Sequence, residues 1–204
     1  RELAAEIIAA TKQGAGDLPV SVKTRIGFKT KITEDWCGFL LEQDISALTV
    51  HGRTAKEMSK VPARWERVKR AVEIRDEILG EDKLQTRIIG NGDALSLADA
   101  RDKAEATGAD GVMLGRAIFG NPWLFHPEID ASNVPVSLRL KVMLEQTKLF
   151  EELLPFKNLA IMKKHYKAYI RDFPGAVELR NKLMEQNTVF DLEVAIDDYL
   201  KANN

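Results

Sequence analysis

The alternation of short apolar runs with helical patterns constrains the fold more than any other feature of this chain. Four such runs begin near residues 19, 47, 87 and 111, and each is followed by apolar side chains at helical spacing. Parallel strands need a crossover connection, which is usually a helix. The alternation therefore predicts an α/β fold with a parallel sheet and helices packed outside it. The predicted strands are 19–26, 47–53, 87–93 and 111–116.

The chain changes character after Pro122. Pro127, Ser132 and Pro135 lie in a linker-like segment, and the residues that follow have helical spacing without a further strand. The sequence therefore predicts a β/α domain over residues 1–126 and a small helical domain over residues 127–204. The predicted helices are 3–12, 34–43, 65–79, 96–107 and 117–125 in the first domain, and 137–154, 157–171, 176–185 and 191–201 in the second.

Composition excludes several classes of protein. The 204 residues are 45% apolar, enough to bury a core, and a net charge of −1 excludes a globally basic nucleic-acid binder. The single cysteine, Cys37, excludes an intrachain disulfide and fits a reducing cytosol. No apolar run approaches the ~20 residues that a membrane-spanning helix needs. The chain opens in a helical pattern without an initiator Met, which indicates a piece of a longer chain.

Polar or glycine-containing residues stand at the end of each predicted strand. In parallel β/α folds the functional groups gather at this carboxyl edge of the sheet. We therefore expect these side chains to form one site. They are Lys23, Arg25, His51, Arg53, Asn91, Gly92, Asp93, Gly115 and Arg116.

Four of these side chains have a structural alternative. Lys23 either stabilises negative charge on a cofactor or substrate, or packs its stem on apolar neighbours. Arg25 lies on the same strand face and either binds a carbonyl or phosphate or forms a surface salt bridge. His51 ends an apolar strand before Gly52, which favours a ligand contact over a purely structural role. Arg53 either binds substrate or holds its loop.

Two glycine-containing turns indicate a phosphate site. Asn91-Gly92-Asp93 precedes a predicted helix, and Gly115-Arg116 opens another. Glycine lets backbone N–H groups face an anion, and helix N-termini carry the positive end of the helix dipole. Asn-Gly-Asp alone is more often a plain turn, but the pair of turns favours phosphate binding. No metal site is predicted, because the histidines lack partners at ligand spacing.

The helical tail contains a basic segment, with seven basic and two acidic residues between Lys157 and Lys182. Lys164, Lys167 and Arg171 recur at three- and four-residue steps, which places them on one helix face. This face is either a solvated surface or a contact surface for a nucleic-acid backbone.

Several motifs stand in a fixed order along the chain. They are Val22-Lys23-Thr24-Arg25, Thr49-Val50-His51-Gly52-Arg53-Thr54, Gly90-Asn91-Gly92-Asp93, Gly115-Arg116-Ala117, Gly120-Asn121-Pro122-Trp123-Leu124-Phe125, Lys164-His165-Tyr166, Gly175 and Arg180. Together they resemble the tRNA-dihydrouridine synthase family, and most closely its bacterial B-type branch. The resemblance covers nearly the whole chain.

This resemblance implies a cytoplasmic, FMN-containing (β/α)8 TIM barrel that reduces the C5–C6 bond of particular uridines in tRNA, with NADPH as the electron source. The chain would be the carboxyl-terminal half of the barrel, its last four β/α units, followed by a small all-α tRNA-binding domain. The FMN-binding residues would be Lys23, His51, Asn91, Gly92, Asp93, Gly115 and Arg116. The tRNA-binding residues would be Arg25, Arg53, Lys164, His165 and Arg180.

The chain departs from the family at the catalytic cysteine. That residue lies in an Asn-x-Gly-Cys-Pro segment before the strand that carries the lysine, and no such segment occurs here. Cys37 follows Lys23 and reads as a small core residue. The resemblance therefore implies no catalytic residue in this chain, a general-acid cysteine upstream of Arg1, and a chain that is inactive by itself.

Half a barrel has two unpaired strand edges, which predicts self-association. Two alternative functions remain open from the sequence. One is another FMN-dependent barrel oxidoreductase that acts on a small molecule and has no need of the basic tail. The other is a tRNA-binding fragment without catalysis.

Overall fold

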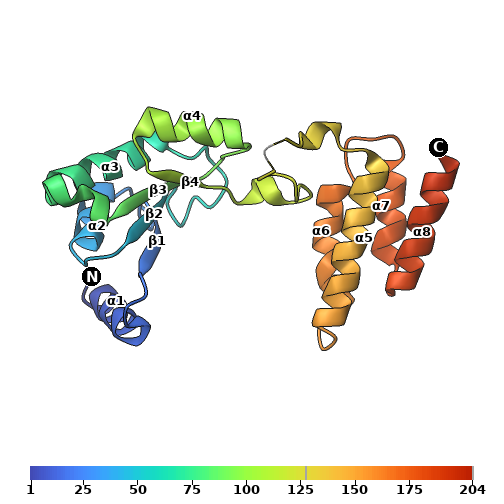
Figure 1. The fold of residues 1–204 in the computed structure, drawn as a ribbon, viewed down its shortest axis with the longest axis horizontal. Coiled ribbons are helices and arrows are strands. Elements are labelled where there is room, and N and C mark those ends of the chain that lie inside the picture. The colour runs from blue at the N-terminus through green and yellow to red at the C-terminus, as the bar shows by residue number, and fades with distance from the viewer. Residues whose placement is uncertain (127, 204) are drawn as a thin grey trace. The chain divides into compact units, whose positions relative to one another are not determined.

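The computed structural model describes residues 1–126 and 128–203. The chain divides into two compact units, Arg1–Ala117 and Ile118–Asn204 (Figure 1). Each unit has its own hydrophobic core. This division falls earlier in the chain than the expected domain boundary after residue 126. Pro127 and Asn204, which the expected second domain includes, lie outside the described residues.

Strands and helices alternate through the first unit, and the last short helix of this series, η2, spans the sequence boundary between the two units. The elements are α1 (Glu2–Ala15), β1 (Ser21–Arg25), α2 (Thr33–Leu41), β2 (Ala47–His51), α3 (Trp65–Leu79), η1 (Gly80–Gln85), β3 (Arg87–Asn91), α4 (Leu97–Thr107), β4 (Gly111–Met113) and η2 (Arg116–Ile118). Helix α4 starts after Ser96, whose hydroxyl accepts a hydrogen bond from the Asp99 N–H at 3.1 Å.

The four strands form one parallel sheet in the order β1-β2-β3-β4, the order in which they occur along the chain. A helix connects each strand to the next, and this is the arrangement of consecutive units in a β/α barrel. The predicted fold class, a partial TIM barrel followed by a helical portion, is therefore confirmed. Strands β1 and β4 are the edges of this sheet.

The core of the first unit lies between one face of the sheet and the helices. Leu48, Val50 and Ile88 are fully buried there, and they belong to the same cluster as Leu40 of α2 and Val68 of α3. Helix α2 contacts α3, and α3 contacts α4 (Figure 1). Because side chains alternate along a strand, the residues between these core positions face the other side of the sheet.

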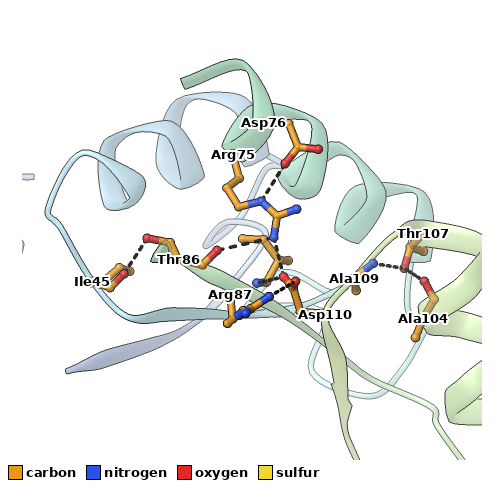
Figure 2. Close-up of polar contacts among 10 residues, drawn as sticks. Ile45, Arg75, Asp76, Thr86, Arg87, Ala104, Thr107, Ala109 and Asp110 are labelled. Atoms are coloured by element: carbon orange, nitrogen blue, oxygen red, sulfur yellow. Dashed lines mark hydrogen bonds and ion pairs between the residues drawn. The ribbon is translucent and has the colours of Figure 1, made fainter. Parts of the chain in front are cut away.

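An ion-pair cluster joins α3 to the amino ends of β3 and β4 (Figure 2). The buried Arg75 guanidinium donates to the carboxylates of Asp110 and Asp76. Asp110 also accepts from the Ile88 N–H at 2.7 Å and from Arg87 at 3.2 Å. Groups at this amino-terminal end of the strands contribute to stability rather than to chemistry in β/α barrels.

The second unit is helical in its described part. Its elements are η3 (Ala131–Asn133), α5 (Val136–Leu153), η4 (Leu159–Met162), α6 (Lys163–Tyr169), α7 (Ala176–Glu185) and α8 (Val189–Ala202). Helix α5 contacts α6 and α8, and α7 contacts α6 and α8. Their shared core includes Leu140, Tyr166, Ile170 and Leu183, all fully buried.

Two expected helices were wrong in detail. The helix predicted over 157–171 is shorter and consists of η4 followed directly by α6. The Asn158 side chain accepts from the Ala160 N–H at 2.8 Å and sets the start of η4, and α6 ends at Tyr169. The helix predicted over 117–125 reduces to η2 followed by turns. Gly120, with a φ of +70°, and Pro122 interrupt helical geometry there.

Among the helices of residues 1–126 and 128–203, none combines the length and the apolar character that crossing a bilayer requires.

Candidate functional site

The carboxyl ends of the strands lie side by side in register. Arg25 is opposite His51, His51 is opposite Asn91, and Asn91 is opposite Met113. The parallel pairing thus brings Arg25, His51 and Asn91 to one edge of the sheet, whereas Lys23 lies in the middle of β1, opposite Thr49. The loops that follow β2, β3 and β4 extend this edge with further charged groups.

His51 stands between several charged side chains. Its Nε2 lies 3.3 Å from Nη1 of Arg53. Burial lowers the pKa of the imidazole to about 4, aided by the positive charges of Arg25, Lys23 and Arg53, while Asp93 acts in the opposite direction. His51 is therefore neutral at pH 7, so it can donate or accept a hydrogen bond but does not supply a positive charge.

Arg53 and Asp93 form the innermost ion pair of the site. Arg53 is only 4% exposed, and its Nη2 donates to Oδ2 of Asp93. Asp93 also accepts from the Ala63 N–H at 2.8 Å and from Arg116 at 2.9 Å. Burial would raise the pKa of Asp93, but the hydrogen bonds from Arg53 and Ala63 outweigh it and lower that pKa. Asp93 is thus an anion that holds two arginines at the sheet edge.

Arg25 holds the loop that follows β2. Its Nη1 donates to the backbone carbonyls of Thr54 at 3.1 Å and Met58 at 3.3 Å. The same loop is closed by Glu57, which accepts from the Thr54 N–H at 2.9 Å and from both terminal nitrogens of Arg64 at 2.8 Å. These contacts, led by the Arg64 hydrogen bonds, lower the pKa of Glu57 to about 2.

Strand β3 and its following turn pack closely against the start of α3. The Trp65 indole donates to the Gly92 carbonyl at 2.9 Å. A Cβ atom on Gly90 would lie 2.4 Å from the Trp65 ring, so only glycine fits there. The Asn91 side-chain amide donates to the Met113 carbonyl at 2.7 Å and ties β3 to β4.

A cavity of ≈580 Å³ opens beside the end of β1. The indole of Trp36 forms one wall and donates to the Thr24 hydroxyl at 2.8 Å. Burial, together with the charge of Arg25, lowers the pKa of Lys23. The cavity thus combines basic groups with apolar and aromatic walls, a combination that suits a planar ligand with an acidic or carbonyl group. Its lining residues are Lys23, Thr24, Arg25, Gly27, Phe28, Ile32, Trp36 and Ala55.

Gly115 and Arg116 lie beyond the end of β4. The Arg116 side chain is 65% exposed even though it pairs with Asp93. A Cβ atom on Gly115 would meet nothing within 4 Å, so its backbone is open to approach. An exposed guanidinium next to an open backbone segment is able to contact an anion.

Sequence reasoning did not assign a site role to Trp65, Glu57 or Arg64. The Thr54-x-x-Glu57 spacing is the one available signal, because it resembles the reciprocal hydrogen bonding of a capping box. No pattern in the sequence indicates that Trp65 packs on Gly90. The fit between an indole and a glycine depends on how α3 lies on the sheet.

The predicted tRNA-binding residues of the second unit have unequal exposure. Lys164 is exposed on α6. His165 makes an edge-to-face contact with Phe119, and burial followed by the charge of Lys164 lowers its pKa. Arg180 on α7 donates to the Ile170 carbonyl at 3.4 Å. Lys164 and Lys167 are the exposed lysines of α6. The expectation that Arg171 shares their helix face was wrong, because α6 ends at Tyr169 and Arg171 lies 3.6 Å from the carboxylate of Asp172.

Cys37 is fully buried, and burial raises the pKa of its thiol to about 12. Such a thiol stays protonated and inaccessible, which fits the core role expected from the sequence. Over residues 1–126 and 128–203, no three His, Cys, Asp or Glu side chains are grouped so that they could hold a metal ion.

Comparison with known protein families shows the family to which the chain belongs. A family model described as "Dihydrouridine synthase (Dus)" matches residues 1–203. The chain belongs to the dihydrouridine synthase family. Within this family it is 40% identical over 202 residues to a "Probable tRNA-dihydrouridine synthase" of Staphylococcus aureus. It is 39% identical over 202 residues to a "Probable tRNA-dihydrouridine synthase 2" of Bacillus subtilis (strain 168).

Each of these alignments covers 97% of this chain and 59% of the relative. The chain therefore spans about three fifths of the length of the dihydrouridine synthases that it matches. The family resemblance expected from the sequence motifs is confirmed.

Proposed function

We propose that the chain is part of an FMN-dependent tRNA-dihydrouridine synthase, an oxidoreductase that reduces the C5–C6 bond of uridines in tRNA with NADPH as the electron source. The observation that carries the proposal is the alignment of Arg25, His51 and Asn91 at one sheet edge, with Lys23 two residues before Arg25 on the same strand face. The family membership supports the reaction class. The single cysteine supports a reducing compartment, the cytosol.

The residues at this edge fit a phosphorylated flavin. The open backbone at Gly115 and the exposed Arg116 guanidinium offer donors to a phosphate. Lys23 and the aromatic wall of the neighbouring cavity suit a flat ring with carbonyl groups. When bound, FMN supplies the two-electron chemistry that the side chains of this edge lack.

This chain contributes binding and electrostatics in this proposal. The Lys23 ammonium stabilises negative charge on the flavin or on the uracil carbonyls. His51, being neutral, orients the ligand through a hydrogen bond. No general acid is assigned here, because the fully buried Cys37 thiol has no access to a substrate.

The second unit supports the tRNA part of the proposal. Lys164 and Lys167 are exposed three residues apart on α6, whereas Arg171 is exposed beyond the end of the helix. The two lysines share one helix face and can contact phosphates of the RNA backbone. A base-modifying enzyme must take its target base out of the stack, so contacts to the backbone hold the RNA while the base moves.

Flavin binding tests the cofactor part of this proposal. FMN fluorescence is titrated against the wild-type chain, the Lys23→Ala variant and Lys69→Ala, which removes an exposed lysine of α3. We expect Lys23→Ala to weaken binding about 10- to 100-fold, since a hydrogen bond to a charged group contributes about 1.5–3 kcal/mol. Unchanged affinity in Lys23→Ala, or a wild-type chain that does not bind FMN, contradicts it.

Binding to tRNA tests the second part. Gel shifts over a salt series compare the wild-type chain with Lys164→Ala/Lys167→Ala, and with Lys29→Ala/Lys31→Ala as the control for lost charge. We expect weaker binding and a shallower salt dependence only in the first variant, because each lost phosphate contact reduces the slope by about 0.7–0.9. Flavin binding without tail-dependent tRNA binding would instead favour a small-molecule oxidoreductase. The converse result would favour a non-catalytic tRNA-binding protein.

A further inference from the structure

We infer that Arg53 is a positioning residue that holds the His51 imidazole in its Nδ1–H tautomer and so directs an N–H donor at the ligand of the sheet edge. The inference deepens the proposed function and rests on it for the identity of that ligand. It replaces the expectation that Arg53 touches RNA with a role inside the protein.

The surroundings of Arg53 leave little of its guanidinium for an external partner. The residue is 4% exposed. Its Nε donates to the Val61 carbonyl, and its Nη2 donates to Asp93. The third direction of the planar group, through Nη1, is taken by His51 Nε2 at 3.3 Å. The hydrogen-bond donors of Arg53 therefore have partners within the protein, and the side chain connects the end of β2 to the loops that contain Val61 and Asp93.

The chemistry of the Arg53–His51 contact fixes the proton on the ring. An arginine remains protonated in proteins and has donors but no acceptor. Nε2 of His51 must accept in this contact, so it carries a lone pair. A neutral imidazole has one proton, which is then on Nδ1.

The charges around His51 keep this tautomer neutral. Positive side chains approach from β1 (Lys23 and Arg25) and from the loop after β2 (Arg53), and Asp93 after β3 is the opposing charge. The charge of Asp93 is shared with Arg53 and Arg116. A second proton on the ring would add to the net positive charge, so His51 resists protonation.

Packing closes the Nε2 side of the ring and leaves the Nδ1 side for a ligand. A Cβ atom on Gly92 would lie 2.9 Å from Cδ2 and 3.1 Å from Nε2 of His51. The Gly92 backbone thus covers the same ring edge that Arg53 contacts. His51 is half-buried, and in the part of the chain that the structure describes its recorded hydrogen bond is the one at Nε2. Nδ1–H is then the donor available to an acceptor oxygen of the bound ligand.

The test reads the tautomer without any cofactor. The chain has three histidines, His51, His126 and His165, and ¹⁵N-histidine NMR of the whole chain resolves the two ring nitrogens of each, with His51→Asn identifying the signals. At pH 7 we expect His51 to have a protonated Nδ1 and an unprotonated Nε2, and to keep this pattern down to about pH 5. A His51 with the proton on Nε2, or with both nitrogens protonated at pH 7, overturns the inference.

Two variants connect the tautomer to Arg53. In Arg53→Met we expect the proton to shift to Nε2, and Arg67→Met, on the surface of α3, is the control that leaves the pattern unchanged. Since Arg53→Met leaves Asp93 without its buried partner, Arg53→Met/Asp93→Asn removes both charges and repeats the measurement in a chain without an isolated charge. An unchanged tautomer in both variants contradicts the positioning role.

Ligand binding provides an independent readout. An asparagine amide reaches the position of Nδ1, whereas a glutamine amide reaches that of Nε2. We expect His51→Asn to retain FMN affinity within about threefold, and His51→Gln to lose about tenfold, corresponding to about 1.4 kcal/mol. The opposite ranking contradicts the inference. A chain that has the expected tautomer but does not bind FMN would contradict the proposed function alone.

Discussion

Gly92 combines two restrictions at one residue. Its φ is +117°, a backbone conformation that residues with a side chain rarely adopt, and a Cβ atom on Gly92 would lie 2.7 Å from Ala63 Cβ. We expect Gly92→Ala to destabilise the protein by about 1–3 kcal/mol through backbone strain and overpacking. Urea denaturation of wild type and variant measures this difference.

Gly14 is the matched control for that substitution. It lies within α1, and a Cβ atom there meets nothing within 4 Å. Gly14→Ala is expected to stabilise the protein by about 0.5–1 kcal/mol, because alanine has the higher helix propensity. If the two variants had equal stability, the positive φ of Gly92 would have no energetic consequence.

Single residues also mark how far the sequence predicted the site. The alignment of Arg25, His51 and Asn91 follows from their positions at strand ends, since parallel register brings such ends together. The pairing of Arg53 with Asp93 does not follow, because it depends on how two loops 40 residues apart fold over each other. Whether Arg53 faces a ligand or the protein is decided by that geometry alone.

At the scale of elements, the Arg75 cluster fixes α3 on the sheet (Figure 2). Asp110→Asn leaves the buried Arg75 without its main anion, and the remaining partner is Asp76. We expect a loss of about 3 kcal/mol, at the low end of the range for breaking a buried pair, because Asp76 still compensates part of the charge. Thermal and urea unfolding measure it.

Arg87→Ala tests the same cluster from its exposed side. The Arg87 side chain is 51% exposed and pairs with the other oxygen of Asp110. Its loss is expected to cost only about 0–1 kcal/mol, as for other surface pairs. A cost equal to that of Asp110→Asn would mean that burial does not set the strength of these contacts.

Element boundaries show where pattern and tertiary structure diverge. Helix α3 occupies the predicted residues, because its apolar spacing continues without a breaker from Trp65 to Leu79. The segment after Lys157 has equally good helical spacing, but its first turn, capped by Asn158, is the 3-10 helix η4, and α6 begins only at Lys163. Periodicity reports which face is apolar, whereas local side-chain hydrogen bonds decide where a helix begins.

At the scale of the whole molecule, ionisation makes stability depend on pH. Folding lowers the pKa of His51 from 6.5 to about 4, so the unfolded chain takes up a proton first as the pH falls. Stability is expected to be full above pH 6.5 and to decrease from there to about pH 4. The lowered pKa values of Asp93 and Asp110 extend the decrease below about pH 3.9.

The urea midpoint measured between pH 7.5 and 4 checks this expectation. His51→Gln should flatten the profile between pH 6.5 and 4. His165→Gln is the comparison, because the pKa of His165 is also lowered and contributes in the same direction. A midpoint that rises on acidification would contradict the neutral, half-buried state of His51.

The free edges of the sheet give the last prediction. Within residues 1–126 and 128–203, β1 has β2 as its one partner strand and β4 has β3. The 204-residue chain is therefore expected to self-associate through these edges as its concentration rises. Light scattering measures the mass, and Met113→Lys, which places a charge on β4, should lower it. A stable monomer at all concentrations would contradict this role of the edges.

Cys37 has one practical consequence. It is the only thiol in the sequence and is a fully buried member of the core of the first unit. Alkylating reagents added at neutral pH reach the Cys37 thiol only when the first unit opens. The rate of alkylation therefore measures how often this unit opens, even when the open state is too rare for equilibrium methods. A Lys164→Cys variant would carry a second, exposed thiol. This thiol would react with a fluorophore before the buried Cys37 thiol reacts.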